Sequence, residues 1–283
     1  MSKDDRVDVV VRCRNEMPHT RATLDMLQRQ AYPTGKILFV DCGSTDGSRE
    51  AAQQRVGFEI IDLDPSQYIP GRVLNMGMNR TESDVVAFIN ADAIPDDPST
   101  LGALVAPLIN DDSIAAGYGR QLARPSADRL TKMDYKRVFG SSTQVAMRRG
   151  RFFSMAGSAI SRAVWTRLPF DEELRYSEDV DWTHRVTAMG WKVIYVPHAR
   201  FQHSHNYGVR EQYQRRFGEG AADNRIHRLG SPSWLREWAK PLAGSLLRDA
   251  RARIFTPSSV AIRCAQATGY YAGRHKTPSI SRT

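Results

Sequence analysis

Short apolar runs alternate with amphipathic segments along the first 110 residues of the chain. Four runs rich in β-branched and other apolar residues predict strands at 7–13, 37–40, 58–63 and 85–89. The segments that follow them carry apolar residues at helical spacing and predict helices at 20–30, 49–55, 71–79 and 101–108. Strands that alternate with helices in this way are typical of βαβ units, so we predict an α/β fold.

The second half of the chain repeats this pattern less regularly. Further strands are expected at 114–118, 155–160 and 193–196, and helices around 164–165 and at 181–189. Residues 120–150 mix charges, serines and single aromatics, which predicts an irregular segment. Beyond residue 207 the pattern is helical and rich in Lys and Arg, so we expect a basic helical extension at 226–283.

The composition is that of an ordinary globular protein, because 41% of the 283 residues are hydrophobic and 25% are charged. No apolar run approaches the ~18 residues that a membrane span needs. Residues 1–6 lack the apolar stretch of a secretory signal. Cys13, Cys42 and Cys264 lack metal-type spacing, so we expect reduced thiols and a cytoplasmic protein.

The net charge of +9 indicates an anionic partner or simply an exposed basic face. A phosphate-bearing substrate, an anionic membrane surface and nucleic acid are the candidate partners. Nucleic acid is not expected, because the chain has no recognisable binding motif and no strand that interleaves basic and aromatic residues. Residues 234–253 form a basic amphipathic pattern that suits a membrane surface, packing on the rest of the chain, or dimerisation, and Pro241 would interrupt a single helix.

The strand predicted at 85–89 ends in Asn90-Ala91-Asp92, which is similar to a truncated Asp-x-Asp sequence. In parallel α/β sheets the carboxyl ends of the strands form the ligand crevice. A buried carboxylate at the end of a strand needs a partner of opposite charge. A divalent cation that also coordinates phosphate oxygens would provide one. The alternative is a capped strand end with Asp92 in solvent.

A second acidic sequence, Glu178-Asp179-Val180-Asp181-Trp182, is expected to begin a helix. The helix dipole alone favours acidic residues there. One of the carboxylates could instead act as the general base towards a sugar hydroxyl. Arg185 lies one turn after Asp181, so we expect an ion pair between them.

Two histidines and a glycine-rich turn complete the candidate chemistry. His203 and His205 follow a strand, and on an extended segment their side chains point to opposite faces, so we expect one metal ligand and one structural or substrate contact. Asp41 opens the glycine-rich turn at 42–48 and could accept hydrogen bonds from a base or ribose. A purely structural turn capped by Asp46 is the alternative.

Taken in order, these sequences resemble the family 2 glycosyltransferases of the GT-A fold. The matching segments are Val7-Asp8-Val9-Val10-Val11 with Arg14-Asn15-Glu16, the turn from Val40 to Gly47, Asn90-Ala91-Asp92, the sequence from Ser177 to Trp182, and His203-Ser204-His205. They span about residues 7–220. A rhamnosyltransferase-type branch of the family is also indicated, by the segments at 71–77 and 201–207. The resemblance implies a mixed, mostly parallel sheet flanked by helices. It also implies inverting transfer of a sugar from a nucleotide-diphosphate donor, assisted by Mg²⁺ or Mn²⁺, to a glycan or lipid-linked acceptor in surface polysaccharide or glycoconjugate synthesis.

The resemblance implies a role for each candidate site residue. Asp179 would be the catalytic base with Glu178 beside it, and Asp92 would bind the metal with His203 or His205. The nucleotide sugar would contact Arg12, Arg14, Asn15, Glu16, Asp41, Ser44, Arg72, Asn75, Asn90 and Ala91. The acceptor would contact Gly157, Ser158 and Trp182. Cys42 and Asn90 each replace an aspartate that is common in the family, which puts the base selectivity and the build of the metal site in question.

The resemblance also implies a domain plan, with a catalytic domain at 1–225 divided into a nucleotide-binding half at about 1–110 and an acceptor half at 111–225. We expect the enzyme to lie at the inner face of the membrane if residues 234–253 bind it. Two other classes share part of this chemistry. A nucleotidyltransferase would release pyrophosphate and normally has a basic glycine-rich loop before residue 20, where none is visible. A non-catalytic nucleotide-sugar or membrane-binding protein would not need both Asp92 and Asp179.

Overall fold

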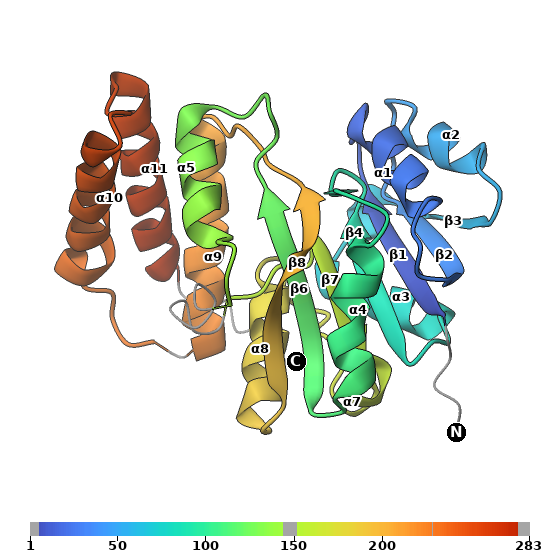
Figure 1. The fold of residues 1–283 in the computed structure, drawn as a ribbon. Helices are drawn as coiled ribbons and strands as arrows, with labels where there is room; N and C mark the ends of the chain where they lie inside the picture. The colour runs from blue at the N-terminus through green and yellow to red at the C-terminus, as the bar shows by residue number, and fades with distance from the viewer. Residues whose placement is uncertain (1–5, 144–151, 228, 277–283) are drawn as a thin grey trace. The chain divides into compact units, whose positions relative to one another are not determined.

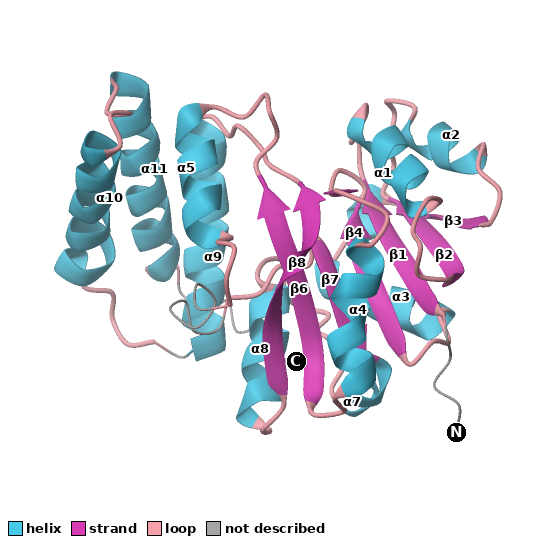
Figure 2. Cartoon of the chain, viewed as in Figure 1, coloured by secondary structure: helices cyan, strands magenta, loops and turns pink. Residues whose placement is uncertain are grey.

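The computed structural model of the chain describes residues 6–143, 152–227 and 229–276 (Figure 1). Its largest element is an eight-stranded mixed sheet with the order β3-β2-β1-β4-β7-β6-β8-β5 (Figure 2). The strands are β1 Val7–Cys13, β2 Thr34–Asp41, β3 Phe58–Asp62, β4 Val85–Asn90, β5 Ile94–Pro95, β6 Ile114–Leu122, β7 Gly157–Ser161 and β8 Lys192–Gln202. The predicted α/β fold is confirmed.

Helices alternate with the strands, and further helices follow the last strand. In the first half these are α1 His19–Leu27, α2 Ser48–Gln53, α3 Pro70–Arg80 and α4 Thr100–Asn110. In the second half they are α5 Arg129–Val138, α7 Arg162–Arg167, α8 Glu178–Ala188, α9 Val209–His227, α10 Lys240–Arg251 and α11 Pro257–Arg274. The helices expected after residue 207 are therefore present.

Parallel pairing brings the candidate residues of the first half to one edge of the sheet. β1 pairs in parallel with β2 on one side and with β4 on the other. In this register Cys13 lies opposite Asp41, and Arg12 lies opposite Asn90. The carboxyl ends of β1, β2 and β4 therefore meet at the same edge, which is where open α/β sheets bind ligands.

The remaining strands bring the second half of the chain to the same region. β7 runs antiparallel to β4 and β6, β8 runs parallel to β6, and β5 pairs antiparallel with the end of β8. The β5–β8 pairing joins Ile94 to Gln202 and Pro95 to Phe201. Because Asp92 lies two residues before β5 and His203 directly follows β8, this short pairing brings the two predicted metal ligands together.

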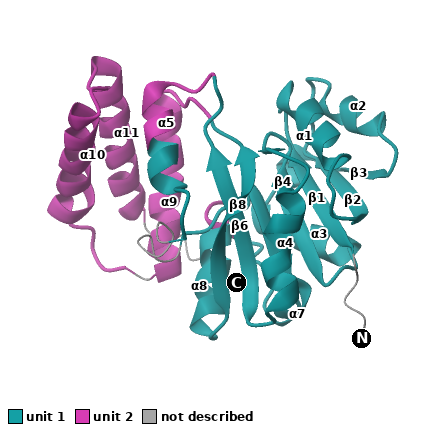
Figure 3. Ribbon diagram, in the orientation of Figure 1, with its two compact units in different colours: residues 1–125, 134–173, 178–204 teal, residues 126–133, 174–177, 205–283 magenta. Residues whose placement is uncertain are grey.

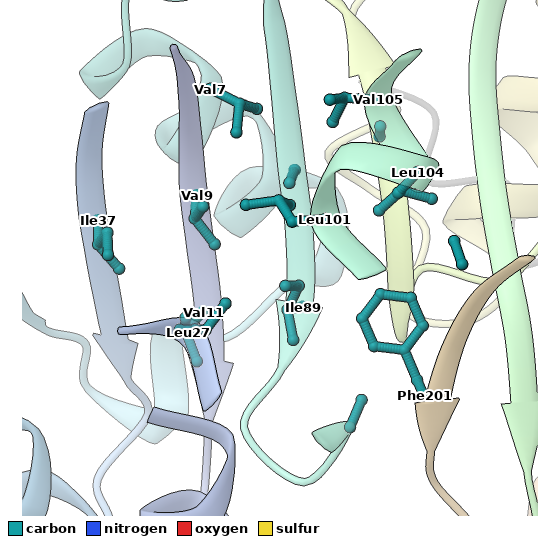
Figure 4. Close-up of a cluster of buried hydrophobic side chains, with 14 of the residues drawn as sticks. Val7, Val9, Val11, Leu27, Ile37, Ile89, Leu101, Leu104, Val105 and Phe201 are labelled. Carbon is teal, nitrogen blue, oxygen red and sulfur yellow. The ribbon is translucent and has the colours of Figure 1, made fainter. Parts of the chain in front are cut away.

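Alternating residues of the buried strands pack into two apolar clusters, one on each face of the sheet. Val9 and Val11 of β1 belong to the cluster that includes Leu104 of α4 (Figure 4). Val10 belongs to the other cluster, with Leu74 of α3. A strand that is buried on both faces has no polar alternation, which explains why the first strands read as continuous apolar runs.

One predicted segment was wrong in part. Residues 129–138, within the segment expected to be irregular, form α5, and none of its residues is buried. Tyr135 and Val138 of this helix pack against a buried cluster, but the charged residues between its apolar positions hid the helical pattern. Residues 144–151 of the same segment lie outside the described residues.

The chain divides into two compact units (Figure 3). Unit 1 comprises residues 1–125, 134–173 and 178–204 and contains the whole sheet, and unit 2 comprises 126–133, 174–177 and 205–283. The domain boundary at residue 225 stays a prediction. None of the helices in the described ranges has the length and apolarity that crossing a membrane requires.

Within unit 2, α9 and α11 pack closely through glycines. A Cβ on Gly220 would come within 2.3 Å of the Tyr270 carbonyl oxygen, and one on Gly273 within 2.1 Å of the Phe217 carbonyl oxygen. The two backbones approach one another this closely only because neither glycine carries a side chain.

Candidate functional site

Asp41 ends β2 and directs its carboxylate towards the glycine-rich turn. Its Oδ2 accepts hydrogen bonds from the backbone N–H groups of Gly43 and Ser44, at 3.1 and 2.9 Å. Its Oδ1 is buried and has no hydrogen-bond partner in the structure. A buried acceptor without a partner is costly, so this oxygen is suited to receive a donor group from a ligand.

The loop after β1 is fastened to the same turn. Asn15 has a φ of +57°, and its Oδ1 accepts a hydrogen bond from the Thr45 N–H at 2.7 Å. The Asn15 N–H donates to Ser44 Oγ at 3.0 Å, and the Met17 N–H donates to Asp46 at 2.8 Å. The side chains of Asn15 and Ser44 therefore hold the loop in shape, and their contact with a nucleotide stays a prediction.

Arg12, the penultimate residue of β1, joins the two acidic sequences. Its Nη2 donates to Asn90 Oδ1 at 3.0 Å, and its Nη1 lies 3.7 Å from Glu178 Oε1. The Arg12 and Glu178 side chains are only 11% and 12% exposed. Arg14 is exposed, whereas Ala91 is fully buried and could offer a nucleotide only its backbone.

Glu178 and Asp179 begin α8, and both carboxyl groups have raised pKa values. Burial raises the pKa of Glu178, and the Arg12 guanidinium opposes this shift. Burial, together with the neighbouring Glu178 charge, raises the pKa of Asp179 to about 7. A base whose pKa lies near the operating pH is effective in general base catalysis. Asp181 instead pairs with Arg185 at 2.7 Å, as predicted.

Asp92 is buried, so the alternative in which it faces solvent is wrong. Its Oδ2 accepts a 2.9 Å hydrogen bond from Nη2 of Arg124, which also contacts the Asp92 carbonyl oxygen. Nη1 of Arg124 donates to the Ser204 carbonyl oxygen, and the Arg124 N–H donates to Ser204 Oγ at 3.0 Å. Arg124 thus ties Asp92 to the residue that separates the two histidines.

Asp92, His203 and His205 each offer one ligand atom, and these atoms lie within 4.8 Å of one another. Nε2 of His203 lies 3.4 Å from Asp92 Oδ2. Both histidines offer a ring nitrogen to this group, because β8 ends at Gln202 and strand alternation ends with it, and which of them would bind a metal stays a prediction. Imidazole and carboxylate donors suit divalent transition metals, and a carboxylate has lone pairs for both Arg124 and a cation. These residues fit a divalent cation.

The structure groups Glu16, which the resemblance indicated, with three residues that the sequence reasoning missed, namely Arg124, His19 and Tyr68. Burial and the charge of Asp92 raise the pKa of Glu16 to about 7, so Glu16 lies near the metal candidates, and its contact with a nucleotide stays a prediction. Burial and the charge of Arg124 lower the pKa of His19. Burial raises the pKa of Tyr68, which lies in the field of the Arg12–Glu178 pair. Sequence reasoning singled out none of Arg124, His19 and Tyr68, and the position of Arg124 two residues after β6 is the signal that could have found it.

The three residues predicted to contact the acceptor lie in the core. Trp182 and Ser158 are 0% exposed, and the Trp182 indole N–H donates to the Leu168 carbonyl oxygen at 2.7 Å. Gly157 lies under Phe201, where a Cβ would come within 2.7 Å of the ring. The side chains of Trp182 and Ser158 pack the fold and Phe201 covers Gly157, so an acceptor does not reach these residues in this structure.

Asn75, predicted to bind the nucleotide sugar, uses its amide to hold the chain around residue 170. It donates to the Phe170 carbonyl oxygen and to Glu172 Oε1, at 3.0 and 2.8 Å. It accepts from the Trp165 indole N–H and the Phe170 N–H, at 2.9 and 3.0 Å. Arg72 is exposed and lies 3.7 Å from Glu172. Neither side chain joins the group around Arg12.

A sequence profile of the glycosyltransferase-like family 2 matches residues 5–222, well over half of the chain. The chain belongs to this family. It is 30% identical to the O-antigen chain rhamnosyltransferase WbaN of Salmonella anatum over 68% of this chain, and it spans only 64% of that relative's length. It is 26% identical to the O-antigen chain rhamnosyltransferase RfbN of Salmonella typhimurium over 89% of this chain and 84% of that protein. The predicted family is confirmed.

Solved structures share the fold of this family member. A mannosyltransferase from Pyrobaculum calidifontis, solved with GDP-Man and Mn²⁺, has a TM-score of 0.66 over 93% of this chain and 85% of that one, at 18% identity. Glucosyl-3-phosphoglycerate synthase from Mycobacterium tuberculosis, solved with Mn²⁺, UDP-Glc and phosphoglyceric acid, has a TM-score of 0.57 over 81% of this chain and 82% of that one, at 20% identity. The likeness concerns the fold, and it confirms the predicted GT-A type.

Proposed function

We propose that the chain catalyses inverting transfer of a sugar from a nucleotide-diphosphate donor to a hydroxyl group of a glycan or lipid-linked acceptor. The observation that carries the proposal is the grouping in unit 1 of Asp179, with its pKa near 7, beside the buried Arg12–Glu178 pair at the edge where β1, β2 and β4 end. The two O-antigen rhamnosyltransferases support a role in surface polysaccharide synthesis and a rhamnosyl or related donor.

The nucleotide would bind at the carboxyl ends of β1 and β2. Oδ1 of Asp41 would accept a hydrogen bond from an N–H of the base or a hydroxyl of the ribose, and so gain the partner that it otherwise lacks. Arg14 is exposed at the end of the same strands and would add positive charge beside the diphosphate. The solved relatives that hold GDP-Man and UDP-Glc support a nucleotide-diphosphate donor of this kind.

We propose that Asp92, His203 and His205 hold Mg²⁺ or Mn²⁺. When bound, the cation would neutralise negative charge on the departing nucleoside diphosphate. Arg124 holds Asp92 and Ser204 in position, so the ligands need little rearrangement to meet a cation. The Mn²⁺ in the two solved relatives supports this assignment.

Asp179 would act as the base. The acceptor oxygen forms a bond to the anomeric carbon, the bond from that carbon to the diphosphate oxygen breaks, and Asp179 takes the acceptor's proton. A single displacement of this kind inverts the configuration at the anomeric carbon. Burial raises the pKa of Asp179, and the charge of Glu178, which Arg12 holds in place, adds to this rise, so the pKa is high enough for efficient proton transfer.

We propose that residues 234–255 of unit 2 contact an anionic membrane surface, where a lipid-linked acceptor would be found. Trp234, Leu235 and Leu247 are more than half exposed, and so is Phe255. Basic residues are exposed among them, namely Arg236, Lys240, Arg248, Arg251 and Arg253. Exposed aromatic and aliphatic side chains among cations are the pattern of helices that bind at the membrane interface.

Thermal unfolding with a panel of nucleoside diphosphates and nucleotide sugars, with and without Mn²⁺, tests the proposal. A ligand that binds only the folded state raises the melting temperature by mass action. We expect one nucleotide to give a rise that depends on Mn²⁺, and its sugar conjugate to release the nucleoside diphosphate, and not pyrophosphate, when acceptor is added. No rise with any nucleotide would refute donor binding.

A further inference from the structure

Gln121, the penultimate residue of β6, contacts His203 across the parallel β6–β8 pair. In register it lies opposite Phe201, and the His203 N–H donates to the carbonyl oxygen of the next residue, Leu122, at 3.0 Å, so His203 follows directly beside Gln121. Nδ1 of His203 lies 2.8 Å from Gln121 Oε1. His203 and Gln121 are only 8% and 5% exposed, so this contact is shielded from water.

A second hydrogen bond fixes the orientation of the Gln121 amide. Its Nε2 donates to Ser154 Oγ at 2.6 Å. The amide has one oxygen acceptor and one nitrogen donor, so with its NH₂ group turned to Ser154 it presents only oxygen to His203. Nδ1 of His203 must then be the donor, and a neutral ring carries its lone pair on Nε2.

Nε2 is the ring nitrogen that faces Asp92, at 3.4 Å from Oδ2. We propose that Gln121 is a positioning residue for a divalent cation, because it fixes the Nδ1–H tautomer and ring orientation that make His203 Nε2 a ligand beside Asp92. The inference rests on the proposed function, which places the cation at these residues. Metal-ligating histidines commonly donate their other N–H to a fixed acceptor, and losing that acceptor typically costs about 10–100-fold in metal affinity.

The reverse orientation of the amide makes the opposite prediction. With its NH₂ group against Nδ1 and its oxygen against Ser154, Gln121 would leave the His203 proton on Nε2. That nitrogen would then donate a hydrogen bond to Asp92 and would have no lone pair for a metal. The two orientations therefore predict different ring tautomers in the metal-free protein.

The tautomer is measured by long-range ¹H–¹⁵N NMR of ¹⁵N-histidine-labelled, metal-free protein, with His203→Gln used to assign the signals. At a pH where the ring is neutral we expect the Nδ1–H pattern in the unaltered protein and in Gln121→Glu, which keeps an acceptor. Gln121→Met keeps the length of the side chain without an acceptor, and we expect it to lose this pattern. An Nε2–H pattern in the unaltered protein would overturn the inference.

Binding of Mn²⁺ alone, followed through the EPR signal of the free ion, tests the consequence for the metal. We expect affinity to fall about 10–100-fold in Gln121→Met and to stay within about threefold in Gln121→Glu. Gln266→Met is the matched control, because Gln266 of unit 2 also has both ends of its amide hydrogen-bonded. Thermal unfolding shows whether each variant is folded before its affinity is compared.

The possible failures are distinguishable. If the unaltered protein binds Mn²⁺ and Gln121→Met binds it equally well, the role of Gln121 is refuted while the proposed function stands. If the unaltered protein binds no Mn²⁺, the metal assignment of the proposed function is refuted, and the inference with it.

Discussion

Arg124 and Asp92 form an ion pair with 2.9 Å between Nη2 and Oδ2, and their side chains are only 9% and 2% exposed. This ion pair is buried, whereas the ion pair of Arg200 with Asp96 is open to solvent, with the Arg200 side chain 43% exposed. Removing one partner of a buried pair leaves an uncompensated charge in the interior. An exposed pair is screened by water, and its loss changes little.

We therefore expect Arg124→Met to lower the free energy of unfolding by about 3–5 kcal/mol, measured by urea denaturation. Arg200→Met is the matched control and should cost at most about 1 kcal/mol. Equal losses in the two variants would contradict the view that the buried pair holds Asp92 in place.

Asp179→Asn should remove the base while keeping the size of the side chain. We expect the rate of sugar transfer to fall by about 10²–10⁴-fold and donor binding to be retained, since loss of a general base typically has an effect of this size. Transfer is measured by release of nucleoside diphosphate, and donor binding by thermal shift. Asp181→Asn, which removes the partner of Arg185, is the control, and near-normal transfer by Asp179→Asn would refute the assignment.

The raised pKa of Asp179 predicts how activity depends on pH. Because the base must be ionised, kcat/KM should rise with pH towards about 7 and then level off. A profile that is flat between pH 5 and 8 would contradict a base with this pKa.

The same pKa makes a separate prediction for stability. The folded-state pKa lies above the ordinary Asp value of ~3.9, so the folded protein holds this proton more tightly than the unfolded chain does. The contribution of Asp179 to stability is thus largest at low pH and falls as pH rises from about 4 to 7. Asp179→Asn should lack this fall and be the more stable protein at pH 8, which urea denaturation at several pH values measures.

The close approach of α9 to α11 predicts a strong effect of one methyl group. Gly220→Ala would place a Cβ within 2.3 Å of a backbone oxygen, so we expect it to lower the free energy of unfolding by about 1–3 kcal/mol. Gly244→Ala in α10 has only the end of the Arg248 side chain nearby, and should stabilise the helix by about 0.5–1 kcal/mol. Similar effects of the two substitutions would argue against the tight packing of α9 on α11.

The membrane proposal predicts that exposed apolar residues of unit 2 govern vesicle binding. The double variant Trp234→Ser with Leu235→Ser should bind anionic vesicles at least tenfold more weakly in a sedimentation assay, and salt should weaken binding of the unaltered protein. Val56→Ser with Met189→Ser removes exposed apolar residues of unit 1 and should leave binding unchanged. Binding that survives the first pair of substitutions would refute the proposed surface.

The sequence located residues at strand ends better than it identified their partners. Asp41 and Asp92 both end apolar runs, and the βαβ rule correctly places them at the carboxyl edge of the sheet. The contact of Arg124 with Asp92 depends on the β5–β8 pairing, and two residues of β5 give no pattern from which that pairing could be predicted. The acceptor role of Trp182 came from the resemblance alone, and the structure instead shows that the helix turns its ring into the core.

The β5–β8 pairing also has a dynamic consequence. β5 is an edge strand with only two paired residues, so it can fray while the rest of the sheet stays folded. In native-state hydrogen exchange the Asp96 amide, which bonds to the Arg200 carbonyl oxygen across this edge, should exchange far faster than amides of β1. Opening the edge separates Asp92 from His203, so the affinity for a cation includes the free energy of closing the edge. Cation binding should slow hydrogen exchange at the Asp96 amide, and more so the more tightly the cation binds. A sequence change that extends the β5 pairing should tighten cation binding without altering any metal ligand.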